Sequence, residues 1–221
     1  FDLLFDSQEE GQEYVDRYKA SILADGSTVV AERVSFAPQP QSSMSVIDQH
    51  TGYVKAIIGG RGEKTASLTL NRATDTTRQP GSTFKILSTI AGMSEGVIDD
   101  GTYINCTGSF DLVTPPINCW NKQGHGEIEI REAIEQSCNY YFNMVGFKLG
   151  QDADGNFSEN RSLSVLQKYA SEIGLDKKTG IEITESAPHV SDSYAVPSYI
   201  GQGTNAYTTS QLARYATAIA T

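Results

Sequence analysis

The stretch Arg78-Gln79-Pro80-Gly81-Ser82-Thr83-Phe84-Lys85 is the most informative part of this 221-residue sequence. Apolar residues recur at helical spacing after Pro80-Gly81, which predicts a helix over 82–95 that Gly96 ends. Ser82 and Lys85 are three positions apart and therefore share one face of that helix. The free N–H groups of a helix start disfavour a cation, and together with burial they would lower the pKa of Lys85. A neutral lysine beside a serine is an activated nucleophile, although a capping serine with a solvated lysine remains the alternative.

A second candidate feature is Ser137-Cys138-Asn139, inside a segment (128–149) with a helical pattern. Residues i and i+2 point to nearly opposite sides of a continuous helix, so Ser137 and Asn139 line one site only if the helix breaks there. Serine and asparagine both favour helix N-caps, which makes such a break plausible and also offers a plain cap as the alternative. Ser158-Glu159-Asn160, in a polar loop, is interpreted as a chance repeat of the pattern.

The sequence contains one Lys-Thr-Gly, at 178–180. It follows a helix predicted over 163–173 and lies in a charged turn. In a catalytic site, a Lys-Thr-Gly motif would lie on an apolar strand with small or hydroxyl residues after its glycine, so that the strand edge can pair with a substrate. Lys178 lies in a charged turn instead, so we do not assign it to the site.

The rest of the chain divides into an N-terminal helical segment with a linker (1–40) and a larger domain (41–221). The pattern predicts a helix within 1–24, and alternation predicts strands over 43–48 and 53–58, joined as a β-hairpin. A further helix is expected over 209–221. Together these elements predict an α/β fold of the α+β type.

The composition excludes several classes of function. The net charge of -10 argues against nucleic-acid binding, because the phosphate backbone would be repelled. Three cysteines do not make a disulfide framework; a Cys106–Cys119 bridge and two half-buried thiols are both left open. With no C-x-x-C or H-E-x-x-H pair, no metal site and no cofactor is expected.

The sequence contains no run of 18 apolar residues, so no membrane span is predicted. The acidic start without methionine leads us to expect a longer parent with its anchor outside this chain.

Serine-x-x-lysine followed by serine-x-asparagine is the signature of penicillin-binding proteins and serine β-lactamases. Other runs strengthen the match over roughly 40–221, and the sequence resembles the transpeptidase domain of high-molecular-mass penicillin-binding proteins, the class A members in particular. These runs are Asn71-Arg72-Ala73-Thr74, Ile47-Asp48, Gly59-Gly60-Arg61, Cys119-Trp120, Gly124-His125-Gly126 and Gly201-Gln202-Gly203.

The resemblance implies an antiparallel sheet packed with helices plus an all-α subdomain. It also implies roles: Ser82 is acylated, Lys85 is its base, Ser137 passes the proton to the leaving group, and Asn139 holds the amide of the substrate. The substrate would be a D-Ala-D-Ala stem peptide of peptidoglycan, with β-lactams as covalent ligands, at the extracytoplasmic face of a bacterial membrane. The alternatives are a serine β-lactamase, whose E-x-x-L-N pattern is absent after Glu159, and a non-catalytic β-lactam sensor.

One departure from the family stands out. In the family, the catalytic Lys-Thr-Gly strand follows the Gly-Gln-Gly segment, and this sequence reaches Thr221 without a second such motif. We therefore expect the C-terminal strands and one oxyanion donor to be missing, the isolated chain to be impaired, and the free hairpin edge to associate with other strands.

Overall fold

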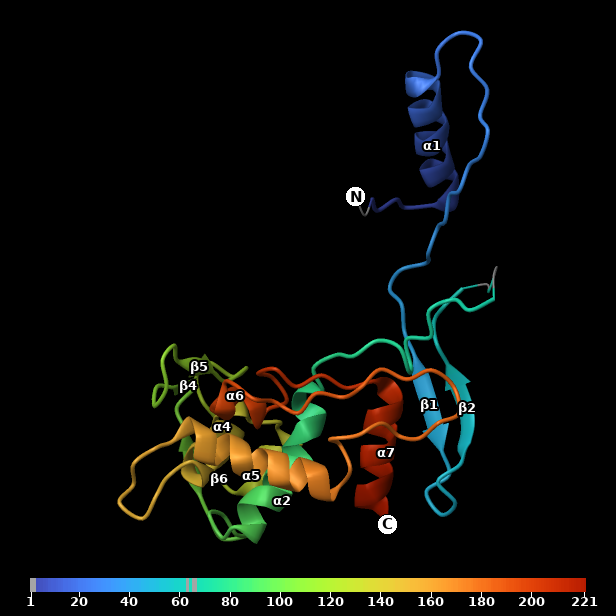
Figure 1. The fold of residues 1–221 in the computed structure, drawn as a ribbon. Coiled ribbons are helices and arrows are strands. Elements are labelled where there is room, and N and C mark those ends of the chain that lie inside the picture. The colour runs from blue at the N-terminus through green and yellow to red at the C-terminus, as the bar shows by residue number, and fades with distance from the viewer. Residues whose placement is uncertain (1–2, 63, 65–66) are drawn as a thin grey trace. The chain divides into compact units, whose positions relative to one another are not determined.

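A computed structural model describes residues 3–62, 64 and 67–221 (Figure 1). The chain forms two compact units, Phe1–Gln41 with Arg61–Thr65 and Ser42–Gly60 with Ala66–Thr221. Each unit is described separately below.

The smaller unit is built on helix α1 (Gln8–Ile22), which begins where Ser7 accepts a hydrogen bond from the Glu10 N–H. The predicted N-terminal helix is confirmed, although residues 1–2 of the range 1–24 lie outside the described residues. Lys19, in the last turn, pairs with Asp16 at 2.9 Å and with Glu32 at 3.0 Å. The pair with Glu32 connects the helix to the segment that follows it, and each of these solvent-accessible pairs contributes little to stability.

In the larger unit, β1 (Met44–Ile47) and β2 (Val54–Ile58) form the predicted antiparallel hairpin. Met44 lies opposite Ile58 and Val46 opposite Ala56, so these side chains share one face, and that face is exposed. The other face of β1 lies against α7 (Thr209–Ala220), as Figure 1 shows. There Ser45 Oγ is 2.9 Å from Ser210 Oγ.

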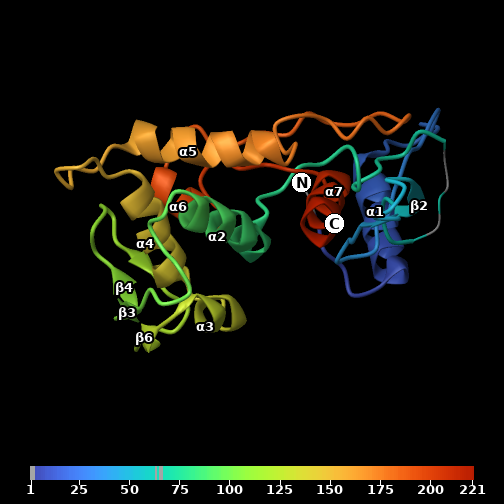
Figure 2. The same cartoon turned by 90° about the horizontal axis from the view of Figure 1, so that it is seen from below.

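A group of packed helices forms the core of the larger unit (Figure 2). It contains a 3₁₀ turn, η1 (Gly81–Phe84), and the helices α2 (Lys85–Ser94), α3 (Ile130–Glu135), α4 (Asn139–Leu149), α5 (Glu159–Glu172) and α6 (Ala195–Ser198). Phe84, Leu87 and Ala91 are fully buried on one face of η1 and α2, at the spacing that the sequence predicted. The helix expected over 82–95 is therefore confirmed, except that its first turn is 3₁₀.

Two short antiparallel strand pairs are formed by the segment that follows α2 and precedes α3 in the chain. Strand β3 (Ile104–Cys106) pairs with β6 (Gly126–Ile128), and β4 (Ser109–Phe110) pairs with β5 (Ile117–Asn118). With the hairpin and the helices they complete the expected α/β architecture.

Two helix boundaries differ from simple periodicity. The segment 128–149 starts with the last residue of β6 and then contains two helices, with a break at 136–138. Helix α5 starts four residues earlier than expected because Ser158 caps it by accepting from the Arg161 N–H. The second Ser-x-Asn is thus a helix cap. No helix in the described part of the chain is long and apolar enough to cross a bilayer.

Candidate active site

Ser82 lies on an exposed 3₁₀ turn that two glycines shape. Gly81 has a φ of +57°, and its N–H donates to the carbonyl of Gly201 at 3.1 Å. Gly201 also has a positive φ of +74°, and a Cβ there would collide with the backbone of Gly81. The Gly-Gln-Gly segment therefore braces the turn before Ser82 through a backbone contact that only glycine permits.

The hydroxyl of Tyr215 holds the start of α2 from the other side. It accepts a hydrogen bond from the Leu87 N–H at 3.0 Å and donates to the Thr83 carbonyl at 3.1 Å. Leu87 and Thr83 are four residues apart, so the hydroxyl bridges a donor and an acceptor that would otherwise pair within an α-helix. A side chain inserted there accounts for the 3₁₀ geometry of the turn that carries Ser82.

Lys85 is buried, with 3 % of its surface exposed, and its ammonium group meets the Ser-x-Asn segment. Nζ lies 2.7 Å from the Ser137 carbonyl oxygen, 2.9 Å from Ser137 Oγ and 2.7 Å from Asn139 Oδ1. An ammonium has three donors, so these three acceptors satisfy it completely. Lys85 and Ser137 are 52 residues apart in the sequence, and the lysine side chain links them directly.

The break between α3 and α4 explains how Ser137 and Asn139 reach the same cation. Ser137 adopts a left-handed φ of +50°, which non-glycine residues rarely take and which recurs at functional sites. Its N–H donates to the Ile134 carbonyl, and the Cys138 N–H donates to the Ala133 carbonyl, so the end of α3 stays hydrogen-bonded. Asn139 then begins α4. The predicted break is confirmed, and it turns both polar side chains toward Lys85.

Burial lowers the pKa of Lys85 from 10.5 to about 8, while the nearby thiols of Cys138 and Cys119 oppose that shift when charged. With a pKa near 8, roughly one lysine in ten is a neutral amine at pH 7. A neutral amine can accept a proton, which an ordinary lysine rarely does at this pH.

The role of Lys85 as the base of Ser82 requires that Ser82 Oγ lie within hydrogen-bond reach of Nζ. The described residues include no hydrogen bond between these two side chains; the contact between them is the Lys85 backbone N–H to the Ser82 carbonyl. The three acceptors at 137 and 139 occupy the ammonium in this state. The structure thus groups Lys85, Ser137 and Asn139, with Ser82 one turn before Lys85.

A second group of polar side chains adjoins the Ser-x-Asn segment. The donor atoms of Cys106, Cys119, His125 and Cys138 all lie within 4.8 Å of one another. The three thiols are free and buried. Of the two alternatives left open, the Cys106–Cys119 bridge is therefore wrong and unbridged thiols are correct. Local spacing did not reveal this cluster, because Cys106 comes from β3, Cys119 and His125 from the segment between β5 and β6, and Cys138 from the α3–α4 break.

The cluster holds its sulfur atoms in unequal settings. Burial raises the pKa of the Cys119 thiol, but hydrogen bonds from the backbone N–H groups of Tyr140, Asn121 and Asn139 outweigh it, and the net pKa is lowered. Burial raises the pKa of the Cys138 thiol well above its usual value. Cys119 is therefore the thiol of this pair that loses its proton first.

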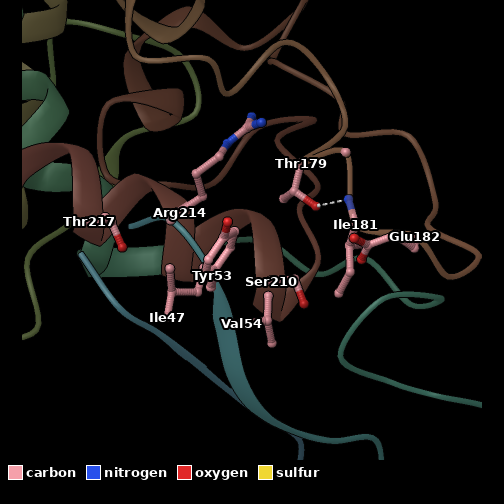
Figure 3. Close-up of a pocket in the computed structure, with 11 residues that line it drawn as sticks. Ile47, Tyr53, Val54, Thr179, Ile181, Glu182, Ser210, Arg214 and Thr217 are labelled. Atoms are coloured by element: carbon pink, nitrogen blue, oxygen red, sulfur yellow. Dashed lines mark hydrogen bonds between the residues drawn. The ribbon is translucent and has the colours of Figure 1, made fainter. Parts of the chain in front are cut away.

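The Lys178-Thr179-Gly180 motif lies in the turn after α5, as expected. Arg214 donates to the Lys178 carbonyl, and the Thr179 N–H and hydroxyl bind the Glu185 carboxylate. Thr179 also lines a cavity of about 540 Å³ between the hairpin, α7 and the 179–182 turn (Figure 3). None of the four predicted site residues lines that cavity.

Comparison with known proteins identifies the family. Residues 43–221 match the penicillin binding protein transpeptidase domain. The chain belongs to this family. Peptidoglycan D,D-transpeptidase MrdA of Acinetobacter baumannii is 29% identical over 115 residues, which is 51% of this chain and 15% of that protein. Penicillin-binding protein 1A of Clostridium tetani is 32% identical over 167 residues, which is 67% of this chain and 20% of that protein. The chain thus matches a fifth or less of the length of these relatives.

Solved penicillin-binding proteins share the fold. PBP2 of Pseudomonas aeruginosa superposes with a TM-score of 0.67 at 21% identity, covering 81% of this chain and 46% of that one. PBP2 of Helicobacter pylori gives a TM-score of 0.66 at 21% identity, covering 82% and 39%. An imipenem acyl-enzyme of penicillin-binding protein A from M. tuberculosis gives 0.57 at 23% identity, covering 68% and 34%.

Proposed function

We propose that this chain carries the acylation site of a serine-type peptidoglycan D,D-transpeptidase. The observation that carries the proposal is the buried Lys85 ammonium, bonded to both Ser137 and Asn139. Ser82 is the nucleophile that attacks the carbonyl between the two terminal D-alanines of a stem peptide. The acyl group is then transferred from Ser82 to an amine of a neighbouring peptide strand, which breaks the serine ester and restores the Ser82 hydroxyl.

Lys85 supplies the base. In its neutral form it takes the proton of the Ser82 hydroxyl as the Ser82–acyl bond forms. The Ser137 hydroxyl, 2.9 Å from Nζ, then carries a proton to the nitrogen of the departing D-alanine. Such positioned proton transfers contribute typically about 10²–10⁴ in rate.

Asn139 binds the substrate. Its Oδ1 already accepts from Lys85, so the acceptor end of the amide faces the lysine and Nδ2 remains as a donor. That donor fits the amide carbonyl of a peptide or of a β-lactam side chain. The Ser82 N–H, at the start of a helical turn, serves as an oxyanion donor.

The same site would be acylated by β-lactams, which mimic the stem peptide. A protein of the same fold has been solved as an imipenem acyl-enzyme, and curated relatives are named peptidoglycan D,D-transpeptidases. Because the substrate is peptidoglycan, we propose that the reaction takes place at the extracytoplasmic face of the cell membrane. The net charge of -10 disfavours nucleic acid as a partner.

These 221 residues contain Lys-Thr-Gly only at 178–180, in the turn after α5, so we propose that they supply one oxyanion donor rather than two. Loss of one such donor costs about 10²–10³ in rate. The polypeptide on its own is therefore a slow acylating domain, and a version extended through a further Lys-Thr-Gly is faster.

The test is labelling of the chain with a fluorescent penicillin, followed by peptide mass spectrometry. We expect a stable adduct at Ser82 that is lost in Ser82→Ala and kept in Ser164→Ala, an exposed serine of α5. An adduct at another residue would refute the assignment. Rapid turnover of a chromogenic cephalosporin would indicate a β-lactamase, and an adduct in a parent protein unable to transfer a peptide to a D-amino acid would indicate a sensor.

A further inference from the structure

We propose that Asn205 is a positioning residue for acylation, because its buried amide fixes the loop that holds the Ser82 turn in place. The inference deepens the proposed transpeptidase function and rests on it. Asn205 follows the Gly-Gln-Gly segment, precedes α7 and is 1 % exposed. None of the motifs that identified the candidate site includes this residue.

The Asn205 side chain uses all of its hydrogen-bonding capacity within the protein. Oδ1 accepts from the Ser191 N–H at 3.0 Å and from the Tyr207 hydroxyl at 3.2 Å. Nδ2 donates to the Ser198 carbonyl at 3.2 Å and to the Gln202 carbonyl at 2.9 Å. An amide side chain has two donors and two acceptor sites, so these four bonds satisfy it completely. One side chain thus ties together four separate points of the loop before α7.

The bond to Gln202 fixes the Gly-Gln-Gly segment, which contacts the chain just before the nucleophile. Gly201, which precedes Gln202, accepts from the Gly81 N–H at 3.1 Å. Gly203, which follows it, accepts from Gln79 Nε2 at 2.8 Å. Both acceptors are one residue away from Gln202, so a shift of the Gln202 carbonyl would move them with it.

The bond from Tyr207 reaches the same stretch of chain by a second route. The backbone of Tyr207 pairs with that of Arg78 through two hydrogen bonds of 2.9 Å. Its ring stacks on the buried Phe84 ring, with the ring centroids 5.8 Å apart. Arg78 precedes Ser82 and Phe84 follows it. The stretch that carries the nucleophile is therefore contacted at both ends by groups that Asn205 orients.

A purely structural role is the alternative. Asn205 would then only satisfy buried polar groups, and its loss would lower stability without changing the chemistry at Ser82. The partners of the amide favour positioning, because two of the four lead directly to residues that flank Ser82. Since reacting atoms must approach to about 3–3.5 Å, a displacement of about 1 Å costs roughly 10² in rate.

The test compares Asn205→Ala with Ser162→Ala in the 221-residue chain. Ser162 is equally buried, and its hydroxyl donates to the Gly146 carbonyl at 2.7 Å, between α4 and α5. Both variants lose buried hydrogen bonds and should unfold at lower urea concentration. In folded Asn205→Ala, the limiting rate of fluorescent-penicillin labelling should fall about 10–10²-fold, with the half-saturating penicillin concentration unchanged. Ser162→Ala should label like the original chain.

Asn205→Asp separates the shape of the side chain from its hydrogen bonds. A carboxylate has the shape of the amide and keeps both acceptor bonds, but it cannot donate to the Gln202 carbonyl. This variant should label as slowly as Asn205→Ala, and it decides the matter if Asn205→Ala does not fold. Labelling at the full rate in either variant would overturn the proposal, and so would equal slowing in Ser162→Ala.

Amide hydrogen exchange at Gly81 gives a readout that needs no penicillin. The Gly81 N–H donates to Gly201, so it should exchange about tenfold faster in Asn205→Ala than in Ser162→Ala. If the original chain is not labelled at Ser82, the proposed function fails, and exchange at Gly81 still decides whether Asn205 holds the turn. Equal exchange in the two variants would overturn the inference.

Discussion

Lys85 Nζ lies 2.9 Å from the Ser137 hydroxyl and 2.7 Å from the carbonyl oxygen of the same residue. Both acceptors are available to one cation because the backbone of Ser137 is left-handed, which turns its carbonyl and its side chain to the same side. A helix without the break would direct Ser137 and Asn139 apart. The break between α3 and α4 is therefore the feature that assembles the candidate site.

Acylation should depend on pH through Lys85. Burial lowers its pKa to about 8, and only the neutral amine accepts a proton, so the active fraction grows as pH rises. The second-order rate of penicillin labelling should increase about tenfold per unit below pH 7 and level off above about pH 8. Lys85→Arg, which cannot lose its proton, should label about 10²–10⁴ times more slowly at every pH. Lys168→Arg, an exposed lysine paired with Glu95, is the control. A rate independent of pH between 6 and 9 would contradict Lys85 as the base.

Gly201→Ala should disturb the Ser82 turn. An L-residue at the positive φ of Gly201 costs about 1–2 kcal/mol, and here the new Cβ would also collide with the Gly81 backbone. Gly155→Ala has a similar φ of +84° with open space around it, so it reports the conformational cost alone. Urea unfolding should show a larger loss of stability for Gly201→Ala than for Gly155→Ala. Penicillin labelling should slow only in Gly201→Ala. Equal effects of the two variants would mean that the contact with Gly81 is unimportant.

The sequence predicted the elements of the fold well where periodicity was strong. The hairpin, α1, α2 and α7 follow from alternation or helical spacing, and the turn residues mark their ends. The 3₁₀ turn at Ser82 was not predictable, because it depends on the Tyr215 hydroxyl, more than 100 residues later in the chain. Local propensity cannot report a contact of that range.

Within the candidate site, sequence motifs named the candidate residues, and long-range packing decided which of them are in contact. Ser82, Lys85, Ser137 and Asn139 were identified by motif and resemblance. That Lys85 binds Ser137 and Asn139 rather than Ser82 depends on the rotamer and burial of one lysine. The cysteine–histidine cluster was missed because its members are not closely spaced in sequence, although Cys138 inside the Ser-x-Asn motif was a usable signal.

Tyr215→Phe should loosen the start of α2. The hydroxyl satisfies the buried Leu87 N–H and the Thr83 carbonyl, and an unsatisfied buried group costs about 1–3 kcal/mol. We expect a loss of stability in that range by urea unfolding. Tyr103→Phe removes an exposed hydroxyl and should change stability by less than about 0.5 kcal/mol. If both variants unfold at the same urea concentration, the bridge through Tyr215 contributes nothing.

The hairpin should associate with a second copy of the chain. In the described residues β1 and β2 form a two-stranded sheet in which β2 pairs with β1 alone, so the outer edge of β2 keeps unpaired N–H and carbonyl groups. The register adds an exposed apolar face beside that edge, with Met44 opposite Ile58.

A charge on an edge strand blocks this kind of pairing, so Ile58→Lys should shift the association to higher protein concentration. Leu112→Lys adds the same charge at a similarly exposed apolar residue in the loop between β4 and β5, and it should leave association unchanged. Sedimentation velocity over a range of concentrations measures both. A chain that stays monomeric throughout, or one for which the two variants behave alike, would show that the β2 edge does not pair.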